Sequence, residues 1–209
     1  MVSGGAAAAG APRRAEMVMD VACVLSYLVF TRFRRAAQRL RADGTEVELV
    51  FLPYRFRPDA DPRGEPLVET HRRDRGEAAV REIQATTGFG AADGLHVDFT
   101  RVVSTDTFHA HRLIAQAAAQ GRGEAMAERL FRAYFSDGVN VAEHPTLRRL
   151  AEEAGVGMHA GGAVGLRAEL ERVRAAAVAG GAVPAFRFAD GRVLAGEQPQ
   201  EAFAAALAQ

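Results

Sequence analysis

The chain has 209 residues, 48% of them hydrophobic and 25% charged, which is enough for one sizeable globular domain or for a domain with a large insertion. Its 26 basic and 26 acidic residues give zero net charge, so charge favours neither nucleic acid nor an anionic membrane as a partner. Cys23 is the only cysteine. This excludes a disulfide within the chain and favours a reducing cytoplasm. No run of about 18 apolar residues is long enough to span a membrane.

The first quarter of the chain predicts a βαβ unit. Residues 1–15 are rich in Gly and Ala, and we expect a disordered tail there. The apolar run near 17–22 predicts a short buried strand, and the helical periodicity from Val24 to about Leu40 predicts a helix. A second strand is expected at 46–52. Strand, helix and strand at this spacing indicate a right-handed unit with parallel strands.

The rest of the chain changes character twice. From about Arg75 to residue 180 its periodicity is mostly helical. Two strands are then expected near 185–189 and 192–196, joined by a tight turn at Asp190-Gly191. A closing helix begins after Pro199.

The order of these elements predicts the fold. It reads β-α-β, a helical block, and then β-β-α, which indicates an α/β protein with a thioredoxin fold and a large all-helical insertion. We expect a thioredoxin-like domain at 16–65 and 180–209. The helical insertion is expected at 66–179.

The segment with the clearest chemistry lies where the first strand turns into the first helix. Cys23 stands at this junction, three residues after Asp20. The unpaired N–H groups and the positive dipole end of a helix favour a thiolate over a thiol, and the thiolate is the nucleophile in disulfide exchange. We therefore expect Cys23 to be reactive, although a lone cysteine is often only a small buried hydrophobic residue.

Several segments, in order along residues 18–208, resemble the FrnE-like branch of the DsbA oxidoreductases. That branch reads Asp-x-x-Cys-Pro-Trp-Cys-Tyr where this chain has residues 20–27, with Asp20, Cys23 and Tyr27 kept. Val24-Leu25 replaces Pro-Trp, and Ser26 replaces the second Cys. Four more segments match in the right order, at residues 51–58, 105–114, 130–135 and 182–186, and the Gly-Glu-Gln-Pro at 196–199 resembles the family's Gly-Ala-Gln-Pro.

The resemblance implies roles for residues far apart in the sequence. Pro184 matches the family's cis-proline, which faces the cysteine, and the Val183 backbone would pair with an extended peptide or a thiol ligand. Asp106 takes the place of a family Asn in the insertion, and His111 is expected near the groove between the two parts. Asp20 and Tyr27 would shape the surroundings of the thiol.

The missing second cysteine changes the expected mechanism. Ser26 cannot form a disulfide, so only monothiol chemistry is left to Cys23, with Ser26 and Pro184 beside it. A low-molecular-weight thiol would act as co-substrate and no cofactor would be bound. The substrate would be a small thiol or disulfide-bearing molecule. The name of the FrnE-like branch associates it with aromatic polyketide biosynthesis, which suggests a pathway.

Two other functions stay open. Kappa-class glutathione transferases and 2-hydroxychromene-2-carboxylate isomerases share this architecture and carry Ser-Pro-Tyr-Ser-Tyr at the same place, so an enzyme of that type is an alternative. A non-catalytic accessory binding protein is another, because the dithiol site is lost. His109 and His111 point in different directions on a helix, so we expect no metal site. The sequence leaves a homodimer open.

Overall fold

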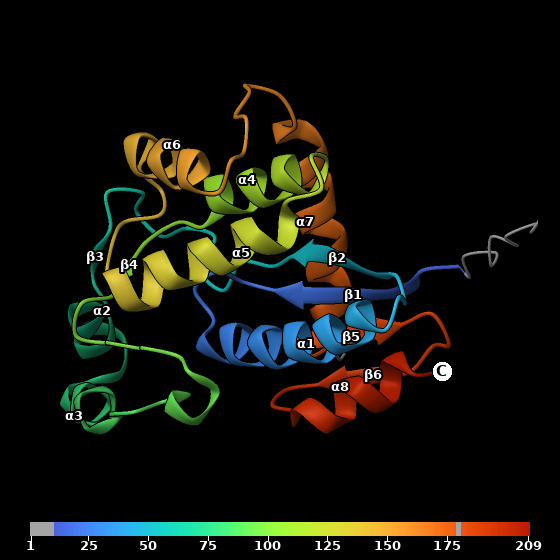
Figure 1. Ribbon diagram of the computed structural model, residues 1–209. Helices are drawn as coiled ribbons and strands as arrows, with labels where there is room; N and C mark the ends of the chain where they lie inside the picture. The colour runs from blue at the N-terminus through green and yellow to red at the C-terminus, as the bar shows by residue number, and fades with distance from the viewer. Residues whose placement is uncertain (1–10, 179–180) are drawn as a thin grey trace, which may run out of the picture.

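The computed structural model describes residues 11–178 and 181–209 (Figure 1). Its main sheet has four strands: β1 (Arg13–Met19), β2 (Val47–Pro53), β5 (Ala185–Phe188) and β6 (Val193–Ala195). Their order is β2-β1-β5-β6. β1 and β2 are parallel, whereas β5 is antiparallel to both β1 and β6. This topology confirms the predicted α/β thioredoxin fold.

Helices α1 (Val24–Ala42) and α8 (Gln200–Leu207) pack side by side against this sheet (Figure 1). The ring of Phe33 on α1 stacks on Phe186 of β5 at a centroid distance of 5.0 Å and meets Phe203 of α8 edge-on at 5.9 Å. All three rings are almost completely buried. One aromatic cluster therefore holds together the first helix, the C-terminal hairpin and the last helix.

The segment between β2 and β5 is largely helical. Its elements are α2 (Leu67–Arg75), α3 (Glu77–Ala85), a short 3-10 turn η1 (Ala91–Asp93), α4 (Phe108–Ala118), α5 (Gly123–Arg132), a π-helical turn η2 (Ala133–Asp137), α6 (His144–Glu153) and α7 (Ala163–Val178). Most of the buried side chains of α4, α5 and α6 belong to the same hydrophobic cluster as those of the sheet. The insertion is thus built onto the core of the thioredoxin-like part.

Three sequence predictions need correction. The insertion is not all helical, because β3 (Glu65–Pro66) pairs with β4 (Val103–Ser104), and strands of two residues are too short to leave an alternating pattern. The helix α2 begins at Leu67, before the helical block expected from about Arg75. The predicted tail at 1–15 overlaps β1, because Arg13 donates its N–H to Glu46 O at 2.8 Å and begins the pairing with β2. The rest of that tail, residues 1–10, lies outside the described residues, as does the insertion boundary at 179–180.

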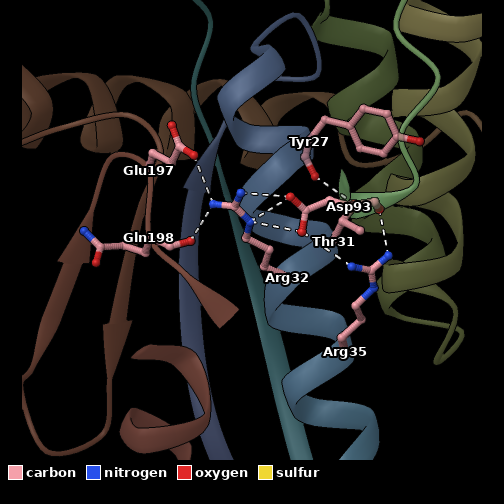
Figure 2. A network of polar contacts seen from close by, with 7 residues as sticks. All are labelled: Tyr27, Thr31, Arg32, Arg35, Asp93, Glu197 and Gln198. Atoms are coloured by element: carbon pink, nitrogen blue, oxygen red, sulfur yellow. Dashed lines mark hydrogen bonds and ion pairs between the residues drawn. The ribbon is translucent and has the colours of Figure 1, made fainter. Parts of the chain in front are cut away.

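A polar network ties α1 to two distant segments. Figure 2 shows the guanidinium group of Arg32 between Asp93 of η1 and the loop at Glu197 and Gln198. It donates to Asp93 Oδ2 at 2.8 Å, to Glu197 Oε1 at 3.1 Å and to Gln198 O at 3.0 Å. Arg35 donates to Asp93 O at 2.7 Å. Since both Arg32 and Asp93 are mostly buried, each is the main partner that offsets the other's desolvation.

We therefore expect Arg32→Gln to lower the free energy of unfolding by about 1–3 kcal/mol, because it leaves the Asp93 carboxylate with only the longer contact to Arg35, at 3.4 Å. Urea unfolding followed by circular dichroism measures this loss. Arg149→Gln is the matched control: Arg149 pairs with Glu153 on the surface of α6, and its loss should cost no more than about 0.5 kcal/mol. Equal losses in the two variants would contradict the importance of the Arg32 network.

Candidate active site at the end of β1

Cys23 is the N-cap residue of α1. The chain leaves β1 at Met19, turns, and brings the Cys23 N–H to Asp20 O at 3.0 Å. The Cys23 backbone is extended, with φ −99° and ψ 111°, and its Sγ accepts a hydrogen bond from the Ser26 N–H at 3.4 Å. The sulfur therefore takes the place that a Ser, Thr or Asp oxygen usually takes in capping a helix. The thiol is held at the first turn of α1 as the sequence predicts.

Burial has the largest effect on this thiol, and it raises the pKa of Cys23 above its usual value. The nearby Asp20 carboxylate adds to the rise, while the Ser26 hydroxyl and amide lower the pKa by less. The expectation that the helix N-terminus decides the state of the thiol therefore needs correction. The amide groups do act in that direction, but the cost of placing a negative charge in a largely desolvated site outweighs them.

Asp20 is buried, with 1% of its surface exposed, and it joins three segments of the chain. Its carboxylate accepts from the N–H of Ala22 at 3.2 Å and from the N–H of Phe56, in the loop after β2, at 2.8 Å. His111 of α4 brings its Nε2 to 3.4 Å from Asp20 Oδ1. The expectation that Asp20 and His111 belong to one site agrees with this geometry. The sequence did not assign Phe56 to the site. Half of the surface of Phe56 is exposed, at 50%.

The Val183–Pro184 peptide bond is cis. Val18 pairs with Ala185, so Pro184 lies at the same end of the sheet at which β1 stops and Cys23 follows. The Pro184 carbonyl accepts from the Gly196 N–H at 2.9 Å. Within the part of the chain that the structure describes, no backbone hydrogen bond involves Val183.

Two predicted site residues have other contacts. The ring of Tyr27 stacks on Phe131 at 5.1 Å and on Phe135 at 6.1 Å, and burial raises the pKa of its hydroxyl. Tyr27 is thus part of the core between α1 and α5, as the apolar pattern of the first turns of this helix indicates, and no contact with the thiol is among those described. Asp106 forms an ion pair with Arg55 at 2.6 Å, from Asp106 Oδ1 to the Arg55 guanidinium.

The Ser26 side chain is buried beside Cys23. None of its surface is exposed, and its Oγ has no hydrogen-bond partner of good geometry among the described residues. A buried hydroxyl without a partner costs free energy. Ser26 therefore places a hydroxyl donor next to the sulfur, where it is available to a Cys23 thiolate.

The described residues contain neither a group of metal ligands nor a membrane-spanning helix. Within 11–178 and 181–209, no three His, Cys, Asp or Glu side chains are grouped closely enough to hold a metal ion. None of the helices in these ranges is both long and apolar enough to cross a membrane. His111 borders a groove of about 1470 Å³ between β2, α4 and α7, which is large enough for a small organic ligand.

The raised pKa of Cys23 predicts slow alkylation at neutral pH. At a given pH, a higher pKa means a smaller thiolate fraction, so the iodoacetamide rate should reach half its maximum at a higher pH than for the same chain unfolded in urea. Ser26→Ala should move this midpoint further up, because Ser26 lowers the pKa, and Asp20→Asn should move it down. Mass spectrometry of the alkylated protein follows the rate. A midpoint below that of the unfolded chain would contradict the effect of burial.

Comparison with known proteins agrees with this geometry. The structure resembles a probable DsbA oxidoreductase from Streptomyces coelicolor, with 27% identity, a TM-score of 0.72, and 94% of this chain and 89% of that one covered. It also resembles the cytosolic disulfide reductase DsbM from Pseudomonas aeruginosa with GSH, with 24% identity, a TM-score of 0.52 and coverage of 87% and 89%. A 2-hydroxychromene-2-carboxylate isomerase has 13% identity, a TM-score of 0.54 and coverage of 88% and 89%. At such low identity the last two likenesses show the fold alone.

The sequence matches none of the curated proteins with which it was compared. The profile of the DSBA-like thioredoxin domain matches residues 15–208. These residues include both parts of the sheet, the whole insertion, and every side chain of the candidate site. The chain therefore belongs to the family of DSBA-like thioredoxin domains.

Proposed function

We propose that this chain carries out monothiol chemistry at Cys23, exchanging or transferring a small thiol or disulfide. The observation that supports this most is the position of the sulfur: the only cysteine caps α1, accepts the Ser26 N–H, and stands at the same end of the sheet as Pro184. A cysteine kept only for packing has no need of this position. The raised pKa lowers the rate at neutral pH but leaves the nucleophile in place.

The reaction has two exchange steps. Cys23 loses its proton to solvent, and the thiolate attacks one sulfur of a disulfide. A new bond forms from Cys23 Sγ to that sulfur, the old S–S bond breaks, and the other sulfur leaves as a thiolate. A low-molecular-weight thiol then attacks the mixed disulfide and releases Cys23. The Ser26 N–H stabilises the Cys23 sulfur whenever it carries negative charge.

The substrate would bind at the end of the sheet that Cys23 shares with Val183 and Pro184, and the buried Asp20 would act through the surroundings of the thiol. The Val183 backbone supports this, because no described residue uses its hydrogen-bonding groups. A reaction that needs an external thiol fits the cytoplasm, where small thiols are abundant. The likeness to the FrnE-like branch supports a role in an aromatic polyketide pathway. A homodimer is compatible with this chemistry but not required by it.

A different function is favoured by one observation, the burial that raises the pKa of Cys23. If the thiolate never forms under working conditions, the chain is an accessory binding protein with the same fold. An isomerase-like activity is a further alternative, supported by the likeness in fold to the 2-hydroxychromene-2-carboxylate isomerase.

The proposal predicts one adduct per chain and no dithiol oxidation. Incubation with oxidised glutathione at pH 8.5 should give a single mixed disulfide, which reduced glutathione removes, as measured by intact mass. The wild type should not reactivate scrambled ribonuclease, because one cysteine cannot hold an internal disulfide.

Ser26→Cys should gain an internal disulfide and part of the missing oxidase activity, because residues 23 and 26 lie within one helical turn. Two controls separate the effects: Cys23→Ser should form no adduct, and Ser26→Ala should form the adduct but no internal disulfide. If Cys23 forms no adduct and Ser26→Cys forms no disulfide, the accessory function replaces the proposed one.

A further inference from the structure

A pocket of about 420 Å³ lies between the loop that follows β2, the start of α4 and α7, and it has no role in the exchange chemistry. One wall is the loop after β2, with Arg55 and Pro58, and the second is the start of α4, with Phe108 and His109. The third wall is one face of α7. The pocket is linked to the thiol segment along the chain. Arg55 lines the pocket, and the next residue, Phe56, donates its N–H to the Asp20 carboxylate.

The α7 wall is strongly basic. Arg167, Leu170, Glu171 and Arg174 line the pocket, and their spacing of three, four and seven residues places them on one face of the helix. Neither Arg167 nor Arg174 forms an ion pair with any described residue. Two guanidinium groups therefore share this face with one carboxylate, Glu171, and neither is paired with it.

The opposite wall carries buried polar atoms that lack partners. Asp106 holds the Arg55 guanidinium by an ion pair at 2.6 Å, yet Arg55 Nε is buried without any hydrogen-bond partner among the described residues. His109 Nδ1 is buried and unpartnered in the same way, and burial lowers the pKa of its ring. Unpartnered buried polar atoms are uncommon in native structures, and here two of them border one pocket.

The aromatic ring at the centre of the pocket is already flanked by cations. Arg55 lies 5.7 Å and Arg167 5.2 Å from the centroid of Phe108. Both guanidinium groups are thereby positioned by the same ring, one from the β2 side and one from α7. Three arginines face two carboxylates, Asp106 and Glu171, so the pocket carries a net positive charge.

We propose that this pocket binds the carboxylate or phosphate group of a small organic anion, held between the Arg55 side of the pocket and Arg167 of α7. Guanidinium groups match the planar oxygen pairs of these anions. Together with the proposed function, on which this part rests, the pocket makes acidic disulfides the preferred substrates of Cys23.

The rate of Cys23 with two aromatic disulfides tests this preference. Dithiobis-nitrobenzoate carries a carboxylate on each ring, and dithiodipyridine carries none. In both reactions the Cys23 sulfur bonds one reagent sulfur, the reagent S–S bond breaks, and the second half leaves as a coloured thiolate. The rate with dithiobis-nitrobenzoate divided by the rate with dithiodipyridine cancels effects on the thiol itself. It should fall about tenfold in Arg167→Gln, which removes a charge-assisted hydrogen bond to the carboxylate, and further in the double variant with Arg174→Gln.

Arg172→Gln is the matched control, because it removes the same charge from another face of α7, where Arg172 pairs with Glu169. Its ratio should stay within about twofold of the wild type. A ratio unchanged in Arg167→Gln and in the double variant would overturn the proposal. An equal fall in Arg172→Gln would overturn it too, since it would show only the general charge of α7.

Binding without chemistry separates this proposal from the proposed function. The Cys23→Ser protein is titrated with benzoate and, separately, with inorganic phosphate, and NMR signals from the start of α4 and from residues 167–174 should shift. Arg167→Gln should weaken the binding of the tighter ligand about tenfold. The tighter of the two identifies the anion class. If Cys23 proves inert but benzoate or phosphate binds in this way, the pocket stands and the exchange function fails. If neither anion shifts these signals at a ligand concentration of about 5 mM, about 10-fold above that of the protein, the pocket is not an anion site.

Discussion

Aromatic contacts join α1 to the elements on both sides of it, and the positions of the other elements depend on them. Phe33 stacks on Phe186 of the sheet, while Tyr27 stacks on Phe131 of the insertion. The first half of α1 is buried between these two parts, with Val29 and Phe30 fully covered. Removing a buried ring of this kind commonly costs about 3–5 kcal/mol. The sheet and the insertion therefore share one core, and the candidate site lies where they meet.

The same burial sets the chemistry of the thiol. At an exposed helix N-terminus, the amide groups and the dipole are worth about 0.3–1 kcal/mol to a negative charge, whereas desolvation of a buried group can shift its pKa by several units. Cys23 begins a helix whose first turns are covered from both sides, so the larger effect wins. Ser26, buried beside it, offsets part of the cost through its amide and hydroxyl.

The local elements were predictable because their signals are local. The periodicity at 24–40 gives α1, and the Asp190-Gly191 turn gives the β5–β6 hairpin. The change from strand to helix pattern placed Cys23 at the start of α1, and the resemblance placed the cis bond at Pro184. Contacts between distant segments left no such pattern. The meeting of His111 with Asp20 depends on how α4 lies over the sheet.

Other site features were missed for similar reasons. The pairing of Arg55 with Asp106 depends on where the loop after β2 ends, although both residues stand in segments that the resemblance marked. A residue that matches a family motif need not act in the site. Tyr27 matches the motif beside the cysteine, but its packing on Phe131 explains its position. The pKa of Cys23 followed from burial, which no local pattern reports.

The sheet order has a consequence for how the chain folds during synthesis. β1 and β2 lie early in the sequence, but β5, the other neighbour of β1, follows only after the whole insertion (Figure 1). Until β5 has left the ribosome, β1 has an unpaired edge and Phe33 lacks the ring of Phe186. Such late, long-range pairing slows folding and leaves apolar surface open to aggregation. Nascent chains of this protein should therefore be good clients for chaperones until the segment from Ala185 onward emerges.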